Sequence, residues 1–387
     1  MRNISINNSF LLSFLKKLVA IESINPSLAS EGGGEEEIAN FIGAHLEKRG
    51  FTIDYQMIDK KRMNVIGVLH GTGSGKTLML NGHTDTVGTS DMKIDALKPT
   101  LKDGKVYGRG SYDMKGGLAA MVAAGEVFAS SKQKMRGDLI LAFVADEEYA
   151  SRGTEELIKK YTADAAIVTE PTELQVVTAH RGFAWARICI EGVPVHGSLY
   201  EYGIDAIVKA GKVLVGLENM ESGFAQLVQH SLLGRPSIHA SLINGGTELS
   251  TYPSKCEIQL ERRTLPHEQL EEIKLELDNL LYDINSMDPD FLATSEVFFY
   301  RPGLDTEQNS PIVKEIIHSC LEVRGVKPKL IGALWWTDAA LLSAAGIPSI
   351  LFGPSGEGGH APVEYVDFDS LIQTTKILAT TIMNYCK

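Results

Sequence analysis

The sequence predicts an α/β fold in which helices lie on both faces of a mixed, mostly parallel sheet, with an α+β sandwich inserted into it. Helical and extended patterns alternate through roughly the first 180 residues and again after Pro302, which is typical of helices on a parallel sheet. Between these stretches the strands are longer and alternate between apolar and polar residues. A chain of 387 residues can form one large domain that carries an insertion. We therefore expect one domain to contain residues 1–179 and 302–387, and the inserted domain to contain residues 180–301.

The first part of the chain carries clear helix and strand patterns. Apolar residues at three-and-four spacing and an Ala-rich run predict helices at 9–22, 35–49, 115–130 and 154–161. Short apolar runs predict strands at 51–57, 64–69, 77–81, 138–145 and 165–169.

The inserted part predicts a compact α+β sandwich from the order strand, helix, strand, strand, helix, strand. The strands are expected at 183–191, 237–243, 256–262 and 293–300, and the helices at 204–220 and 268–284. After Pro302 we expect helices at 311–323, at 338–345 and from 368 onward, with a strand at 349–352.

Composition excludes several classes of protein. With 44% hydrophobic and 22% charged residues, the chain is neither fibrous nor disordered. A formal charge of −12 argues against nucleic acid and anionic membranes as partners. No apolar run approaches the roughly 18 residues of a membrane helix, and no secretion signal is recognisable. The four cysteines lack paired or metal-type spacing, so we expect reduced thiols and a cytoplasmic location.

The segment 71–77 looks like a phosphate-binding loop of a nucleotide-binding protein, but two features argue against that function. His70 stands where the first glycine of such a loop belongs, and the residues after the segment predict a strand instead of a helix. We therefore interpret 71–76 as a flexible hairpin turn.

A competing set of metal-type side chains begins at the first buried strands. His83 and Asp85 follow the strand at 77–81, and a period of two points both to one side. The Asp85 carboxylate could then hold one ring nitrogen of His83 and fix its tautomer. Asp113 lies in the glycine-rich segment 108–117 just before a helix, where it could also serve as a helix cap.

The later strands end in the same kind of residue. Asp146, Glu147 and Glu148 follow an apolar strand, and adjacent carboxylates at a core edge repel unless a cation neutralises them or one holds a proton. A solvated acidic loop is the alternative. Glu170 closes the next strand and His360 follows the last one, although each alone could be an ordinary turn or exposed residue.

Together, two histidines and three carboxylates suit a metal site with nitrogen and oxygen ligands. Five ligands exceed the needs of one tetrahedral ion with an open position, but they fit two ions about 3.5–4 Å apart with a bridging carboxylate. Zinc is the leading candidate, and cobalt or manganese stays open. One of Glu147 and Glu148 would bind metal, and the other could take a proton from metal-bound water.

At these residues the chain resembles the zinc-dependent peptidase and amidohydrolase family of acetylornithine deacetylase, succinyl-diaminopimelate desuccinylase, aminoacylase and the glutamate carboxypeptidases. Nearly the whole chain takes part, and the motifs occur in the family's order. The resemblance implies two ligand pairs and a bridging carboxylate: His83 with Glu170, Glu148 with His360, and Asp113 between them. It also implies that Glu147 is the general base and that Asp85 steers His83.

The resemblance further implies that residues 180–301 form a lid and dimerisation domain of a homodimer. His196 matches a histidine that reaches the partner subunit's active site and polarises the substrate carbonyl; otherwise it is an exposed loop residue. Arg263 matches an arginine that binds the substrate carboxylate, a task that suits its bidentate fork. Arg262 would point to the opposite face of the strand as a surface charge.

Two departures from the family touch substrate recognition. Ser250 stands where many relatives carry Asn, and the acidic partner of Arg263 is Glu261 instead of Asp. Trp335 and Trp336 either line the pocket or contribute to packing.

The sequence therefore predicts a metal-dependent hydrolase that cleaves the amide bond of an N-acyl amino acid, with N-acetylornithine as the first candidate. A water between two metal ions would attack, with Glu147 as the base. Two alternatives stay open: a di- or tripeptidase or carboxypeptidase of the same family, and a noncatalytic metal-binding scaffold.

Overall fold

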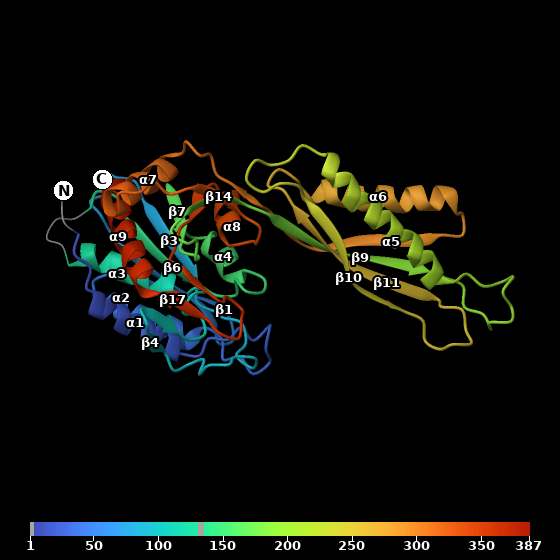
Figure 1. Cartoon of the computed structure of the whole chain (residues 1–387), viewed down its shortest axis with the longest axis horizontal. Helices are drawn as coiled ribbons and strands as arrows, with labels where there is room; N and C mark the ends of the chain where they lie inside the picture. The colour runs from blue at the N-terminus through green and yellow to red at the C-terminus, as the bar shows by residue number, and fades with distance from the viewer. Residues whose placement is uncertain (1–3, 131–134) are drawn as a thin grey trace. The chain divides into compact units, whose positions relative to one another are not determined.

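The computed structural model describes residues 4–130 and 135–387. It divides into two units (Figure 1). The first unit contains the described residues up to Thr178 together with Thr306–Ile331 and Thr337–Lys387. The second unit contains Ala179–Asp305 and the short segment Gly332–Trp336. The second unit is thus an insertion that also takes a few residues from the returning chain.

The larger sheet is mixed, with its parallel strands in the centre. It runs in the order β1-β2-β6-β3-β7-β15-β8-β13, with β14 also paired to β8. Its strands are β1 (Thr52–Asp59), β2 (Arg62–Leu69), β3 (Leu78–His83), β6 (Leu139–Val144), β7 (Ala165–Val168), β8 (Val176–His180), β13 (Leu304–Asp305), β14 (Leu330–Ala333) and β15 (Ser349–Leu351). Strands β6, β3, β7 and β15 pair in parallel, whereas β1, β2, β8 and β13 join by antiparallel pairing. The predicted mixed sheet is confirmed.

Helices cover both faces of this sheet (Figure 1). They are α1 (Asn8–Ala20), α2 (Glu36–Glu47), α3 (Lys115–Ala129), α4 (Arg152–Leu157), α7 (Pro311–Arg324), α8 (Ala339–Ala344) and α9 (Phe368–Tyr385). Helices α1, α2, α3, α7 and α9 share one apolar core with the central strands, while α4 and α8 contact each other. Local sequence explains several ends: Pro311 opens α7, and Gly325 closes it in the left-handed region at φ 70°.

A small antiparallel sheet of order β16-β17-β5-β4 was not predicted. Its strands are β4 (Thr100–Lys102), β5 (Lys105–Tyr107), β16 (Gly356–Glu357) and β17 (Tyr365–Asp367). Each strand is too short to produce a recognisable alternation. Because β5 pairs with β17, the segment after Tyr107 is held beside the segment before Tyr365.

The second unit is the predicted α+β sandwich. Its antiparallel sheet has the order β10-β11-β9-β12. The elements are β9 (Gly182–Glu191), α5 (Ala206–Gly223), η1 (Phe224–Gln226), β10 (Ser237–Gly245), β11 (Lys255–Thr264), α6 (Leu270–Met287) and β12 (Leu292–Arg301). Side chains along β11 alternate in burial, and one face packs against α5 and α6 around a separate apolar core.

Arg262 corrects one prediction, because it is not a surface charge. The alternation of β11 places it on the helix-covered face, where it is fully buried. Its guanidinium binds Glu268 at 2.5 Å and Glu276 at 3.1 Å and lies 4.2 Å from the Phe224 ring. Two carboxylates neutralise the buried charge, as a buried arginine requires.

The segment 71–76 is not a phosphate-binding loop, and it is not a hairpin turn either. It leads into strand β3, so it lacks the helix that a phosphate-binding loop needs. Strand β6 lies between β2 and β3, so the segment connects strands that are not neighbours. The hairpin prediction is therefore wrong.

Among the helices that the structure describes, none combines the length and apolar character needed to cross a membrane.

Candidate metal centre

Strand register brings the predicted ligands to one edge of the larger sheet. In the parallel ladders, His83 on β3 lies opposite Val144 on β6, and Asn81 lies opposite Val168 on β7. The residues that follow these strands therefore leave the sheet at the same edge. In open α/β sheets this carboxyl edge is where ligands bind.

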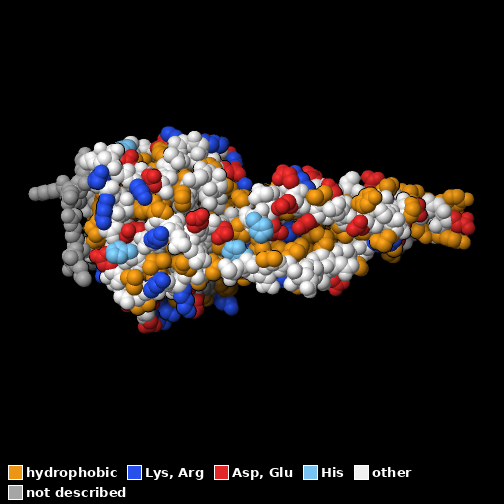
Figure 2. Space-filling model, turned by 90° about the horizontal axis from the view of Figure 1, so that it is seen from above, with side chains coloured by type: hydrophobic (Ala, Val, Ile, Leu, Met, Phe, Trp, Pro, Cys, Tyr) orange, Lys and Arg blue, Asp and Glu red, His pale blue; other side chains and the backbone are white. Residues whose placement is uncertain are grey.

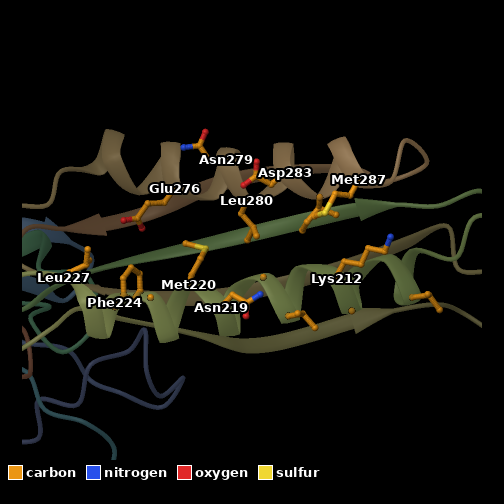
Figure 3. Close-up of a pocket in the computed structure, with 16 residues that line it drawn as sticks. Lys212, Asn219, Met220, Phe224, Leu227, Glu276, Asn279, Leu280, Asp283 and Met287 are labelled. Carbon is orange, nitrogen blue, oxygen red and sulfur yellow. The ribbon is translucent and has the colours of Figure 1, made fainter.

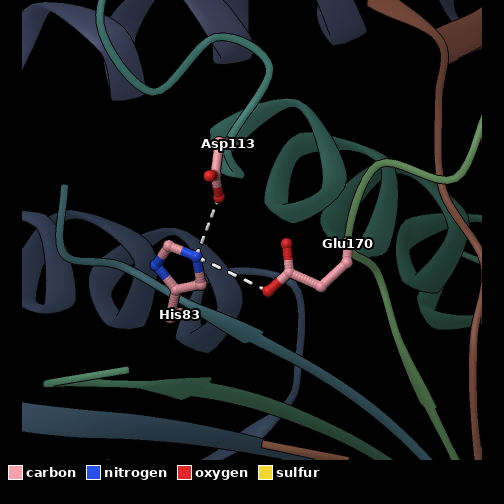
Figure 4. A group of neighbouring side chains, drawn as sticks. All are labelled: His83, Asp113 and Glu170. Atoms are coloured by element: carbon pink, nitrogen blue, oxygen red, sulfur yellow. Dashed lines mark hydrogen bonds and ion pairs between the residues drawn. The ribbon is translucent and has the colours of Figure 1, made fainter. Parts of the chain in front are cut away.

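The first group of candidate ligands is His83, Asp113 and Glu170 (Figure 4). The Nε2 atom of His83 lies 3.1 Å from Asp113 Oδ1 and 3.6 Å from Glu170 Oε1. His83 and Glu170 are buried, with 2% and 6% of their surface exposed. One imidazole nitrogen thus faces two carboxylates in a site that is largely closed to solvent.

The other ring nitrogen of His83 is already used. The Nδ1–H donates to the main-chain carbonyl of Asp85 at 2.9 Å, and the Asp85 carboxylate lies 3.5 Å away. The main-chain carbonyl of Asp85 is therefore the closer acceptor, and the steering of the ring by the Asp85 carboxylate stays a prediction. This contact directs Nε2 toward the carboxylates as the ligand atom.

The second group of candidate ligands is Asp113, Glu148 and His360. His360 Nε2 lies 2.8 Å from Glu148 Oε2 and 3.4 Å from Asp113 Oδ2. The His360 side chain is 55% exposed, and its backbone has φ 61°, which is rare for a residue other than glycine. In this group Glu148 follows the buried strand β6, whereas His360 lies on an exposed loop.

Asp113 belongs to both groups and presents a different oxygen to each histidine. Its loop is held by Glu364, which no sequence motif indicates. The buried Glu364 carboxylate accepts hydrogen bonds from the Arg109 side chain and from the backbone N–H groups of Gly110, Tyr112 and Asp113, at 2.9–3.1 Å. No local signal distinguishes Glu364, because all of these partners lie far away in the chain.

Asp85 also organises the loop after β6. Its two carboxylate oxygens accept the backbone N–H groups of Glu147 and Glu148, each at 3.2 Å. The Asn25 amide donates to the same carboxylate at 2.8 Å. Asp85 thus joins the His83 ring to the Glu147–Glu148 backbone, and no sequence pattern marks Asn25 as part of the site.

Glu147 lies beside the first group without belonging to either group. Its Oε2 is 4.0 Å from His83 Nε2. Burial raises the pKa of Glu147 well above its ordinary value; nearby Glu170 and Asp338 raise it further, while His83 opposes the rise. A carboxyl group that favours the protonated form beside a metal centre is suited to accept a proton.

The residues present fit a pair of divalent ions. Burial, opposed by His83 and assisted by Asp113 and Glu148, raises the pKa of Glu170 to about 8. Burial lowers the pKa of His83, but the surrounding carboxylates raise it well above its ordinary value. Both shifts show that this cluster demands positive charge, and two imidazoles with three carboxylates are ligands that zinc, cobalt and manganese accept.

His196 and Arg263 belong to the second unit and to neither ligand group. His196 is exposed, and its Nδ1 lies 2.9 Å from the Ser198 hydroxyl. Arg263 Nε binds Glu261 at 2.6 Å, and its guanidinium lies 5.2 Å from the Phe183 ring. Their predicted roles in substrate binding stay predictions.

Trp335 and Trp336 also lie in the second unit. The Trp336 indole donates to the Pro302 carbonyl at 2.8 Å and packs edge-on against Phe183. Trp335 is half exposed.

The chain is similar to known proteins along most of its length. The model of peptidase family M20/M25/M40 matches residues 79–384. The chain is 29% identical to N-formyl-4-amino-5-aminomethyl-2-methylpyrimidine deformylase of Halalkalibacterium halodurans, over 98% of this chain and 95% of the relative. It is 28% identical to acetylornithine deacetylase of Myxococcus xanthus, over 90% and 92% of the two chains.

The fold is also similar to that of aminopeptidase PepT from Bacillus cereus, with a TM-score of 0.81 at 20% identity. That alignment covers 99% of this chain and 100% of the other. Since the family model matches most of the sequence and two candidate metal-ligand groups share Asp113, the chain belongs to peptidase family M20/M25/M40 and is a metal-dependent amidohydrolase or peptidase.

Proposed function

We propose that this enzyme removes an acyl group from the nitrogen of an N-acyl amino acid. The observation that carries the proposal is the pair of ligand groups that share Asp113, with the Glu147 carboxylate beside them. A noncatalytic metal-binding scaffold would need the metal ligands, but it would not need a buried carboxylate at this position that is not itself a metal ligand.

In this proposal His83 and Glu170 would hold one divalent ion, Glu148 and His360 would hold the other, and Asp113 would contribute to both. Zinc is the proposed metal, because its preferred ligands include both imidazole and carboxylate. When bound, two such ions lower the pKa of a water molecule to about 7 and polarise the scissile carbonyl.

The residues of the chain then move the proton and hold the substrate. Glu147 accepts a proton from the attacking water and transfers it to the leaving nitrogen. Asp85 keeps the His83 ring and the Glu147 backbone in place through the contacts described above. By the family resemblance, His196 stabilises the oxyanion and Arg263 binds the substrate carboxylate.

The substrate class is supported by the relatives. The two named above are a deformylase and a deacetylase, and each name describes removal of a small acyl group. We therefore favour a deacylase over a peptidase. N-acetylornithine is the first substrate to test, and small peptides are the second class.

We also propose that the second unit mediates homodimer formation. Between α5 and α6 it carries a largely apolar groove of about 1120 Å³ (Figure 3). Apolar side chains also reach the surface seen in Figure 2; in this unit Val208, Val215 and Met287 are 56–80% exposed. Contiguous exposed apolar surface of this kind often marks an interaction site. Light scattering after size-exclusion chromatography would measure the mass, and a monomer at micromolar concentration would contradict the proposal.

The activity is tested with metal-reconstituted protein and a panel of N-acyl amino acids and dipeptides, compared by kcat/KM. We expect a deacylase profile, and Glu147→Ala should lower kcat by at least about 10²–10⁴-fold while two ions stay bound. Glu156→Ala, at a partly exposed residue that pairs with Lys159, is the matched control and should keep its activity. Near-normal turnover by Glu147→Ala would contradict the assigned role, and a strict dipeptide preference would favour the peptidase.

A further inference from the structure

We propose that Arg62 is a positioning residue for the metal centre, because it anchors Asp146 and so sets how Glu147 and Glu148 leave strand β6. The inference rests on the proposed function. It concerns a buried network on the side of the loop away from the ligand atoms.

Arg62 opens strand β2 and is only 3% exposed. Its Nε and Nη2 atoms form a bidentate pair with the fully buried Glu35, at 3.0 and 2.5 Å. Its Nη1 donates to Asp146 Oδ1 at 2.8 Å and to the Ser27 hydroxyl at 3.2 Å. A planar guanidinium can satisfy several partners in fixed directions, which a lysine ammonium cannot reproduce.

Asp146 occupies the sharp turn at the end of β6. Its φ is 72°, in the left-handed region that residues with a side chain rarely adopt. Glycine would adopt this conformation without strain, so the turn alone does not explain an aspartate here. The carboxylate has a separate use, because it is the point at which Arg62 holds the turn.

The network continues from Asp146 to the ligand loop. The Asn25 amide bridges Asp146 Oδ1 at 3.1 Å and Asp85 Oδ2 at 2.8 Å. Asp85 in turn accepts the backbone N–H groups of Glu147 and Glu148. Two contacts therefore hold the backbone of Glu147 and Glu148 in place: the hydrogen bonds to the Asp85 carboxylate and the anchored turn at Asp146.

Charge explains why the anchor must be a cation. Glu35, Asp146 and Asp85 are fully buried carboxylates in one connected network, and Arg62 is the cation that contacts two of them directly. Without the Arg62 cation, these carboxylates would repel each other next to the loop that carries the candidate metal ligands. A change in the turn at Asp146 would displace Glu147, the proposed base for the attacking water, and Glu148, a proposed metal ligand.

The experiment compares four variants of the full-length enzyme. Arg62→Lys keeps the charge but loses the fork, and we expect a 10- to 100-fold lower kcat with KM changed less than threefold. Asp146→Gly relieves the backbone strain but removes the carboxylate that Arg62 holds, so its kcat should fall by the same factor. Asp146→Asn keeps an acceptor for Arg62 and Asn25 and should stay within about fivefold of the original rate. Glu35→Gln is a milder variant that leaves Arg62 in place and still tests the network if Arg62→Lys folds poorly.

A stability control separates positioning from general destabilisation. Ile382→Ala opens a cavity in the buried face of α9, and assays are compared at temperatures equally far below each variant's unfolding midpoint. Its kcat should stay within twofold of the original. If the Arg62 and Asp146 variants lose no more activity than this control, or if Asp146→Gly is fully active, the positioning role is overturned.

Cobalt binding gives a readout that does not depend on the substrate. We expect Arg62→Lys and Asp146→Gly to bind one equivalent of Co²⁺ at least tenfold more weakly and with an altered visible spectrum, whereas Asp146→Asn should match the original protein. If the original enzyme cleaves no amide but these spectra change, the proposed function fails and the positioning role stands. Unchanged affinity and spectra in both variants would overturn the positioning role whatever the activity.

Discussion

The two ligand groups of this enzyme share Asp113 but are built differently. His83 and Glu170 extend from the ends of buried strands, and the Nδ1–H of His83 is fixed by the Asp85 carbonyl. His360 lies on a loop, is 55% exposed and has a left-handed backbone. One group is therefore held by the sheet, while the other depends on segments that come together only in the complete fold.

This difference bears on metal affinity. A ligand that is already in place loses little conformational entropy when the ion binds, whereas an exposed loop residue must be ordered. We infer that the His83 group binds its ion more tightly and exchanges it more slowly than the His360 group. Three tests examine this inference, beginning with the variant that should remove both ions.

The largest effect is expected for Asp113→Ala. Each of its oxygens faces one histidine, so its loss should remove both ions together and erase the difference between the groups. We expect kcat/KM to fall on the order of a thousandfold or more, because several kcal/mol of transition-state stabilisation is lost. Metal analysis after gel filtration measures the ions. Asp138→Ala, just before strand β6, is the control and should keep both ions; a single ion retained by Asp113→Ala would argue against bridging.

The second test compares His83→Ala with His360→Ala. His83→Ala leaves Asp113 and Glu170 crowded and opens a buried cavity, so we expect loss of the tighter ion and a lower unfolding midpoint. His360→Ala should weaken only the other ion, by at least the roughly 10–100-fold that loss of a supporting partner costs, with little change in unfolding. Competition with a chelator and calorimetry measure both quantities. Equal losses from the two variants would show that the groups do not differ as inferred.

The smallest effect is expected for Glu173→Ala. Glu173 Oε1 accepts the Tyr112 hydroxyl at 2.8 Å and the Gly356 N–H at 3.2 Å, so it joins the Asp113 loop to the segment that leads to His360. Each such hydrogen bond contributes at least about 0.5 kcal/mol, so losing both removes about 1 kcal/mol, and the weaker ion should bind about fivefold less tightly while the His83 group is unaffected. Glu173→Gln keeps an acceptor oxygen and is the matched control. A shift in the tighter ion instead would mean that the two groups are coupled through this contact.

Elements with a strong periodic signal could be predicted from the sequence. The buried strands at β3, β6 and β7 and the amphipathic helices lie within a few residues of their predicted limits, because burial pattern and local propensity agree there. The small sheet of β4, β5, β16 and β17 could not be predicted, because its strands have only two or three residues and the pairing of β5 with β17 joins segments far apart in the chain. The segment 71–76 was misinterpreted for a related reason, since local turn residues do not reveal that β6 lies between its flanking strands.

The residue types at the site could be recognised in the sequence, but the residues that hold them in place could not. Metal-type residues at successive strand ends are a pattern that a linear sequence displays. Glu364, Asn25 and Arg62 carry no such pattern, and each acts on residues tens to hundreds of positions away. The predicted surface position of Arg262 failed because one-dimensional alternation does not tell which face of a strand a helix covers.

The sequence by itself determined the fold class, the family and which residue types are available to hold metal, since these follow from periodicity and from motifs read in order. Only the tertiary structure decided that Asp113 faces both histidines, that Glu147 stands apart from the ligand groups, and that an arginine anchors the loop behind them. The physical reason is that each of these facts depends on distances between buried groups brought together by sheet register and packing, and such distances are not a property of any local segment.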